Sequence, residues 1–333
     1  LGIGGRQMFK AETPGPMKDS KMTPRMAETA KGLWAVYTLI SICCVLGYRW
    51  AGMTWLDAIM HMFSTMGLGG FSSHDASFGF FDSPAIEAVS IAFMLIAGCN
   101  FATHYVVLSR RSFRPYLTDP EAGAFLLVSV GSVIAIAIFL DVHGVYPTFS
   151  EALRFSAFNV VSIATTTGYA STDYALWPMF APLWMLFLSS FATSAGSTGG
   201  GIKMIRAIVL YKQVYRELTR AMHPNAIHPV KIGSELVPSN ILFAVLAFGF
   251  MYMVCIVSMT LALSFSDLEI VTAFTAVVAS INNTGPGLGQ VGPATNFGSL
   301  SDFQTWVCTF AMLLGRLEIF TLLVVMTPAF WRK

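Results

Sequence analysis

The sequence predicts an all-α membrane protein with several spans and repeated re-entrant segments. Of its 333 residues, 55% are hydrophobic and only 11% are charged, whereas about a quarter of the residues in soluble domains carry a charge. So few charges do not cover a water-facing surface. The composition therefore excludes ordinary soluble enzymes, collagen, disordered chains and disulfide scaffolds.

Six apolar stretches approach the length of roughly 20 residues that a helix needs to cross a bilayer. They are Leu33–Trp50, Ala85–Leu108, Gly123–Val142, Ala181–Leu210, Val237–Leu263 and Phe303–Met326. Three shorter helical stretches lie between them, at Trp55–Met66, Phe149–Ile163 and Asp267–Ile281. These are too short to cross, which indicates re-entrant segments.

Basic residues alternate along the chain and predict its orientation. They cluster at 6–31, 110–114 and 203–231, whereas residues 51–109 hold no Lys or Arg and residues 115–202 hold only Arg154. The positive-inside rule places the clusters in the cytoplasm and the short helices on the outer side. The net charge of +2 gives no indication of a nucleic-acid partner.

A unit of span, short helix, glycine-rich turn and span occurs three times. The three turns occupy residues 64–72, 164–170 and 281–287. Each places a glycine before a ring-bearing residue, in Gly70-Phe71, Gly168-Tyr169 and Gly285-Pro286. Any one glycine is explained equally well as a helix end or a close packing point. Three similar turns on the same side favour a shared function.

The chemistry of such turns favours a cation pore. Non-helical backbone at membrane depth persists only where it is buried in protein or lines a water-filled cavity. Rings of backbone carbonyls there replace the hydration shell of a potassium-sized ion. Glycine permits the backbone angles that aim successive carbonyls in one direction, and a short helix entering from outside directs its negative C-terminal end at the ion.

Two features near the cytoplasmic side indicate a gate. The fourth span is broken by Ser194-Ala195-Gly196-Ser197-Thr198-Gly199-Gly200-Gly201, with Lys203 following at the boundary. This run is either a flexible break between packed helices or an intramembrane loop that blocks the path until it moves. Arg316 lies in the apolar final span, where a charge is costly and faces the bundle interior. A salt bridge to Glu318 is geometrically poor, so we expect Arg316 to face the pore and bond carbonyls of the loop.

The motifs resemble those of a known family. Residues 63–75, 164–169 and 282–289 are similar to filter segments of the Trk/Ktr/HKT superfamily, and residues 11–16 and 193–203 narrow the resemblance to TrkH-type bacterial potassium uptake subunits. The resemblance implies four span–pore-helix–span repeats around a pseudo-fourfold pore. We expect this chain to supply three of them, at 32–114, 115–231 and 232–333, with 1–31 as the end of a preceding repeat, so that the first repeat is missing.

The resemblance also implies the roles of individual residues. The ion ligands are the carbonyls of Leu68, Gly69, Gly70, Thr166, Thr167, Gly168, Asn283, Thr284 and Gly285. The register of the last segment is open by one residue, and Leu68 stands where the family commonly has threonine. The resemblance favours the gate interpretation of residues 194–201 and Lys203, and it implies an arginine at Arg316 with a barrier role.

The predicted function is potassium-selective permeation across the bacterial inner membrane, with potassium as substrate, no cofactor in this chain and no enzymatic activity. The resemblance implies membrane lipid around a homodimer and a cytosolic ring of regulatory subunits that bind NAD or ATP/ADP; no nucleic acid is expected. The chain itself has no G-x-G-x-x-G turn that opens a βαβ unit, and it has no Walker loop. The alternative is a proton- or sodium-coupled secondary cation transporter, which predicts inverted halves and intramembrane carboxylates.

Overall fold

The computed structural model describes residues 26–225, 228–233 and 235–332. Residues 1–25 lie outside this part of the chain, and with them the motif at 11–16 and most of the predicted division 1–31. Apart from helices and the loops that join them, the described residues contain one antiparallel ribbon formed by β1 (Lys231–Ile232) and β2 (Glu235–Leu236).

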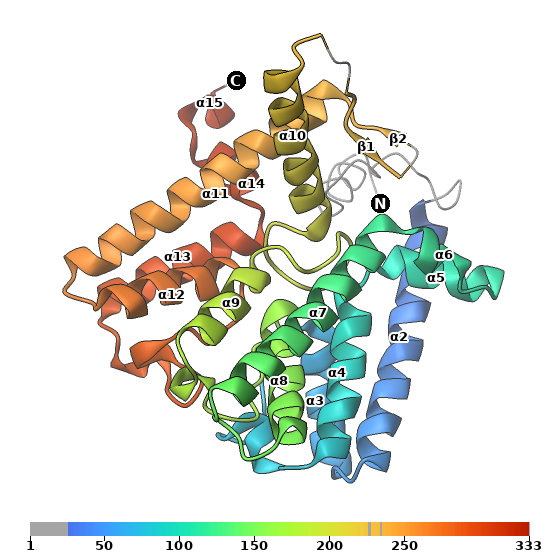
Figure 1. The fold of residues 1–333 in the computed structure, drawn as a ribbon, viewed down its shortest axis with the longest axis vertical. Coiled ribbons are helices and arrows are strands. Elements are labelled where there is room, and N and C mark those ends of the chain that lie inside the picture. Colours follow the sequence, from blue (N-terminus) through green and yellow to red (C-terminus); the bar gives the residue numbers. More distant parts are fainter. Residues whose placement is uncertain (1–25, 226–227, 234, 333) are drawn as a thin grey trace.

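Three groups of helices lie side by side (Figure 1). The first holds α2 (Met26–Trp50), α3 (Trp55–Gly67), α4 (Pro84–Gly98) and α5 (Phe101–Arg110); the second α7 (Pro120–Val142), α8 (Phe149–Ala164), α9 (Phe180–Ser189) and α10 (Met204–Met222); the third α11 (Ser239–Phe265), α12 (Ile270–Ile281), α13 (Asp302–Arg316) and α14 (Ile319–Met326). The shorter α6 (Arg114–Thr118) and α15 (Pro328–Trp331) follow α5 and α14. The short helices α3, α8 and α12 confirm the three short helices that the sequence predicted between the spans.

Three helices in the described residues, α2 from Glu28 onward, α7 and α11, are long and apolar enough to cross a membrane. Two bent pairs raise the number to five if each pair is one span: α4 with α5, bent by 96°, and α13 with α14, bent by 112°. The predicted spans 85–108 and 303–326 are therefore each divided into two helices at a sharp bend. The predicted fourth span, 181–210, is interrupted by a non-helical segment over residues 190–203.

Local backbone chemistry causes the bends. Between α4 and α5 the Asn100 side chain accepts a hydrogen bond from the Ala102 N–H at 2.8 Å, which caps a new helix in a new direction. Between α13 and α14, Glu318 adopts a φ of 55°, which a continuous α-helix does not allow. Hydropathy averaged over a span is insensitive to such single-residue events.

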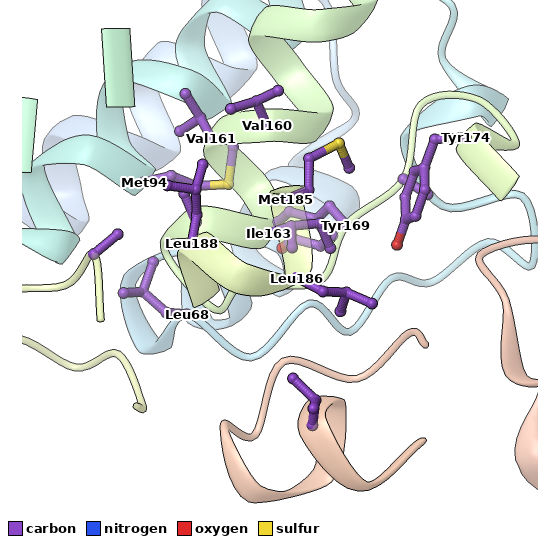
Figure 2. Close-up of a cluster of buried hydrophobic side chains, with 14 of the residues drawn as sticks. Leu68, Met94, Val160, Val161, Ile163, Tyr169, Tyr174, Met185, Leu186 and Leu188 are labelled. Carbon is purple, nitrogen blue, oxygen red and sulfur yellow. The ribbon is translucent and has the colours of Figure 1, made fainter. Parts of the chain in front are cut away.

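Part of the hydrophobic core lies between the short helix α8 and its neighbour α9 (Figure 2). Val160, Val161 and Ile163 of α8 are at most 3% exposed and lie against the equally buried side chains of α9. By contrast, the long helices carry exposed apolar side chains, among them Leu127 on α7 and Phe250 on α11. An apolar exterior around a buried short helix is the arrangement expected of re-entrant segments inside a membrane protein.

Candidate filter and intramembrane loop

The three short helices begin in the same way. Thr54, Thr148 and Glu269 precede α3, α8 and α12, and each side chain accepts the N–H of the residue three positions later. Each cap satisfies one of the unpaired N–H groups at the start of its helix. These caps explain why α3 and α8 start where the sequence predicted. The third helix, α12, starts at Ile270, three residues after the predicted start at Asp267, because Glu269 caps it.

The backbone after each short helix also repeats. Leu68, Thr166 and Asn283 have φ values of 50°, 60° and 54°, and the glycines two residues later have φ values of 69°, 89° and 101°. Residues with side chains rarely adopt positive φ, so this repetition reflects a common constraint. It aligns Asn283-Thr284-Gly285 with Leu68-Gly69-Gly70 and Thr166-Thr167-Gly168.

Equivalent hydrogen bonds hold the three segments against their helices. The N–H groups of Gly69, Thr167 and Thr284 donate to carbonyls five residues earlier, at 2.8, 2.8 and 2.9 Å. The N–H groups of the preceding residues donate to carbonyls three residues earlier, at 3.0–3.2 Å. The N–H groups of the segments are thus bonded to the preceding helices. The carbonyl groups of the segments are not used in these bonds and are available to a ligand.

Adjacent segments touch at their glycines. A Cβ atom on Gly70 would lie 2.1 Å from the Thr167 carbonyl oxygen, and one on Gly168 would lie 1.9 Å from the Thr284 oxygen. Among the described residues, nothing lies within 4 Å of the same position on Gly285. The three segments therefore follow one another in chain order around a common region, and only glycine fits at the two points of contact.

Two buried tyrosines, Tyr48 and Tyr169, bond the helix that precedes the first segment. The Tyr169 hydroxyl donates to the His61 carbonyl at 3.2 Å and lies 3.3 Å from the Thr65 hydroxyl, which also bonds the Tyr48 hydroxyl at 2.6 Å. Tyr169 is fully buried, and Figure 2 places it among the side chains of α8 and α9. The second segment is thereby tied to the helix that supports the first.

The loop predicted at 194–201 contacts the ends of α3 and α12 and the second segment. The Thr198 hydroxyl donates to the carbonyl of Met66 at the end of α3 at 2.9 Å. The Gly200 N–H donates to the Thr166 hydroxyl at 2.8 Å. A Cβ on Gly200 would lie 1.9 Å from the Asn282 carbonyl oxygen. Figure 1 shows this loop between α9 and α10 near the centre of the molecule, where the three groups meet.

The cation that bonds the loop is Lys203. Its ammonium donates to the Gly199 carbonyl and, at 3.3 Å, to the Ser197 hydroxyl. Arg316 was expected to bond the loop carbonyls, but within the described part of the chain it forms no hydrogen bond or ion pair, and its side chain is exposed. It ends α13 beside the bend, directly after Gly315, whose Cβ position is 1.7 Å from the Ile281 carbonyl oxygen.

Glu318 does not pair with Arg316. It forms an ion pair with Arg206 at 3.0 Å, and the Arg206 guanidinium also lies 4.2 Å from the centre of the Phe248 ring. This pair joins α10, just after the loop, to the bend between α13 and α14. The single arginine of residues 115–202, Arg154, bonds Glu87 at 2.7 and 2.9 Å and Asp82 at 2.8 Å, so it links α8 to α4.

The sequence analysis did not identify two residues that contact the loop. Asn100, at the break between α4 and α5, has its side-chain oxygen 2.7 Å from the Cβ position of Gly196. Glu121, near the start of α7, accepts hydrogen bonds from Ala195 and Ile205. For Asn100 the sequence offers only a weak signal, a polar residue inside the apolar stretch 85–108. No sequence pattern signals Glu121.

No group of three or more His, Cys, Asp or Glu residues that would hold a metal occurs in the described ranges. The groups that the three segments present are backbone carbonyls and hydroxyls.

A family model described as TrkH, cation transport protein, matches residues 1–333. The chain belongs to the TrkH family. It is 46% identical to the Trk system potassium uptake protein TrkH of Salmonella typhimurium and to that of Escherichia coli K12, covering all of this chain and 68% of each relative. It is 33% identical to the protein TrkI of Halomonas elongata, over 67% of that relative.

The fold also matches a solved TrkH structure. The crystal structure of the potassium transporter TrkH from Vibrio parahaemolyticus superposes with a TM-score of 0.88 at 44% sequence identity. The match covers 93% of this chain and 66% of the other. The chain thus spans about two thirds of the length of the TrkH proteins that it matches, and the expected family and all-α membrane fold are both confirmed.

Proposed function

We propose that this chain contributes a potassium-selective pathway in a bacterial membrane, with the segments 68–70, 166–168 and 283–285 as its filter and the loop 194–201 as its gate. The observation that carries the proposal is the threefold backbone repeat joined to a single loop. Three segments share one pattern of φ and hydrogen bonds, and residues 198–200 bond or touch the end of each.

The arrangement is suited to a cation. The three short helices direct their C-terminal ends, which carry partial negative charge, at the region where the segments meet. Carbonyl oxygens replace water around a potassium-sized ion without a fixed charge, which permits rapid release. The TrkH relatives are named as potassium uptake proteins, and this supports potassium as the transported ion here.

Closure by the loop follows from its position. Its residues fill the space immediately after the short helices on the side of α10, and Lys203 adds a positive charge to the same place. Hydrogen bonds from Thr198 to the end of α3 and from Gly200 to Thr166 hold the loop, and its glycine backbone permits movement once they break. Arg316 directly follows Gly315, which packs against the Ile281 carbonyl, and its side chain is exposed. In this proposal Arg316 adds a second positive charge beside the path.

The partners follow from the same proposal. α10 carries Lys212, Arg216 and Arg220 beside exposed Tyr211, Val214 and Leu218, a mixed basic and apolar surface suited to a protein partner. We place there, or on the adjoining helices, the second subunit of a homodimer and the ring of nucleotide-binding regulatory subunits. The nucleotide would bind those subunits.

Rubidium-tracer uptake into proteoliposomes holding the full-length protein tests the function. We expect passive uptake that potassium competes away and sodium does not. Uptake that occurs only with an imposed proton or sodium gradient would replace the pore with the coupled-transporter alternative. Empty vesicles, and vesicles with the protein in the absence of a rubidium gradient, give the background.

A further inference from the structure

A buried glutamate lies beside the loop and outside both the proposed filter and the proposed gate. Glu121 is the second residue of α7 and is only 3% exposed. The preceding Asp119 caps the helix by accepting the Glu121 and Ala122 N–H groups at 2.9 and 3.4 Å. With the helix capped by Asp119, the Glu121 side chain is free to act elsewhere.

One oxygen of Glu121 joins the two ends of the loop. Its Oε1 atom accepts the Ala195 N–H and the Ile205 N–H, both at 2.9 Å. Ala195 is the second residue of the glycine-rich run, and Ile205 is the second residue of α10. The intervening residues, including all those that touch the three segments, therefore form a closed bulge whose base is held by a single carboxylate.

Both bonds are of a kind that is hard to replace. The Ile205 N–H is in the first turn of α10, where backbone N–H groups have no partner within the helix. A carboxylate at that end also interacts favourably with the helix dipole. The site is buried, so loss of the acceptor leaves two donors without water to satisfy them.

We propose that Glu121 is a positioning residue that holds the intramembrane loop closed. The inference rests on the proposed gate. While both N–H groups stay on Oε1, the two ends of the loop keep a fixed separation. A movement of the loop that separates its ends must therefore first release one of the two N–H groups. The carboxylate therefore opposes opening without touching the ion path, and it makes α7 the fixed support against which the loop moves.

The test compares three changes at this position, measured as basal rubidium flux in proteoliposomes. Glu121→Ala removes the acceptor, and we expect basal flux to rise at least tenfold, because the loss of even one hydrogen bond to a charged group is worth about that factor. Glu121→Gln retains an oxygen that accepts both N–H groups and should restore most of the closure. Glu121→Asp retains the charge on a shorter side chain, and we expect its basal flux to lie between those of the other two variants. If the alanine variant does not fold, the aspartate variant takes its place in the comparison.

The rubidium-to-sodium permeability ratio separates positioning from general damage. A loosened loop raises flux with the ratio unchanged, because the filter segments are intact. Glu87→Ala is the matched control: Glu87 is also 3% exposed but bonds Arg154 between α4 and α8, away from the loop. We expect no rise in basal flux from this control.

A protein lacking residues 198–200 is the reference for an open loop. If it leaks while Glu121→Ala keeps the flux of the parent, the role of Glu121 is overturned and the gate stands. If the shortened protein does not leak, the gate and the role of Glu121 both fail. If Glu87→Ala leaks as much as Glu121→Ala, loss of any buried carboxylate explains the result and the inference is overturned.

Discussion

The helices on one side of the candidate filter have the same structure in all three groups, whereas those on the other side differ from group to group. The helices that lead into it, α3, α8 and α12, share their caps, their final hydrogen bonds and the φ values that follow. The helices that leave it do not. α4 and α5 meet at a bend of 96°, α13 and α14 at one of 112°, and α9 and α10 are separated by residues 190–203.

This difference assigns different tasks to the two sides. Coordination of an ion by surrounding carbonyls needs equivalent contributions from each repeat, so the entering helices and segments stay alike. Closure needs one movable element, and in the proposed function a single repeat supplies it as a long loop. The other two breaks then act as supports: Asn100 lies against Gly196, and Glu318 is paired with Arg206.

The largest expected effect tests the repeated side. Gly168→Ala places a Cβ 1.9 Å from the Thr284 carbonyl at a φ of 89°, whereas Gly285→Ala carries a similar φ strain with no described atom within 4 Å. We expect the first to change the rubidium-to-sodium permeability ratio by about tenfold or more, because it displaces a neighbouring segment, and the second to change it much less. Equal effects from both would indicate that backbone strain alone is responsible and that the segments do not depend on their contact.

The second effect tests the unrepeated side. Gly200→Ala places a Cβ 1.9 Å from the Asn282 carbonyl and should push the loop away from the third segment. We expect basal flux to rise about tenfold. Gly131→Ala, in α7 with no described atom within 4 Å, is the control and should behave as the parent. If the Gly200 variant folds and its basal flux equals that of the parent, the loop does not contact this part of the third group in the closed state.

A smaller effect is expected from one hydrogen bond of the loop. Thr198→Val retains the shape of the side chain and loses the bond to the Met66 carbonyl. A neutral hydrogen bond contributes about 1 kcal/mol, so basal flux should rise about fivefold. Thr309→Val removes a hydroxyl that bonds its own helix on α13 and provides a matched comparison. If the two variants leak equally, the hydroxyl of Thr198 has no special role.

The smallest effect concerns the bend in the third group. The Arg206–Glu318 pair is partly exposed, with 11% and 31% of the two side chains accessible, and such pairs contribute at most about 1 kcal/mol. Glu318→Gln should therefore change basal flux only about twofold. A double-mutant cycle with Arg206→Gln measures the coupling, and full additivity of the two changes would show that the pair does not link α10 to the bend.

The repeated side could be predicted from sequence and the unrepeated side only in part. Each short helix has a capping residue at its start and a glycine-rich turn at its end, so the predicted and observed bounds agree closely. The register of the last segment stayed open because it is one residue shorter than the second; the positive φ values of Asn283 and Gly285 align it. Whether these residues bind ions stays a prediction.

The remaining features depend on contacts distant in sequence. Hydropathy predicted continuous spans at 85–108 and 303–326 because a bend at Asn100 or Glu318 does not change the average. The cation expected at the loop was Arg316, since a charge in an apolar span is conspicuous, but Lys203 makes the contact. Glu121 and Ala195 are 74 residues apart, and their bond appears only when α7 packs beside the loop.

Flux and selectivity of the protein lacking residues 198–200, measured together in the same vesicles, test the central claim most directly. If three segments select and one loop closes, basal rubidium flux rises well above that of the parent while the rubidium-to-sodium permeability ratio stays the same. Flux at the level of the parent would show that the loop does not close the path. A rise in flux accompanied by loss of selectivity would show that the loop and the filter are not separate elements.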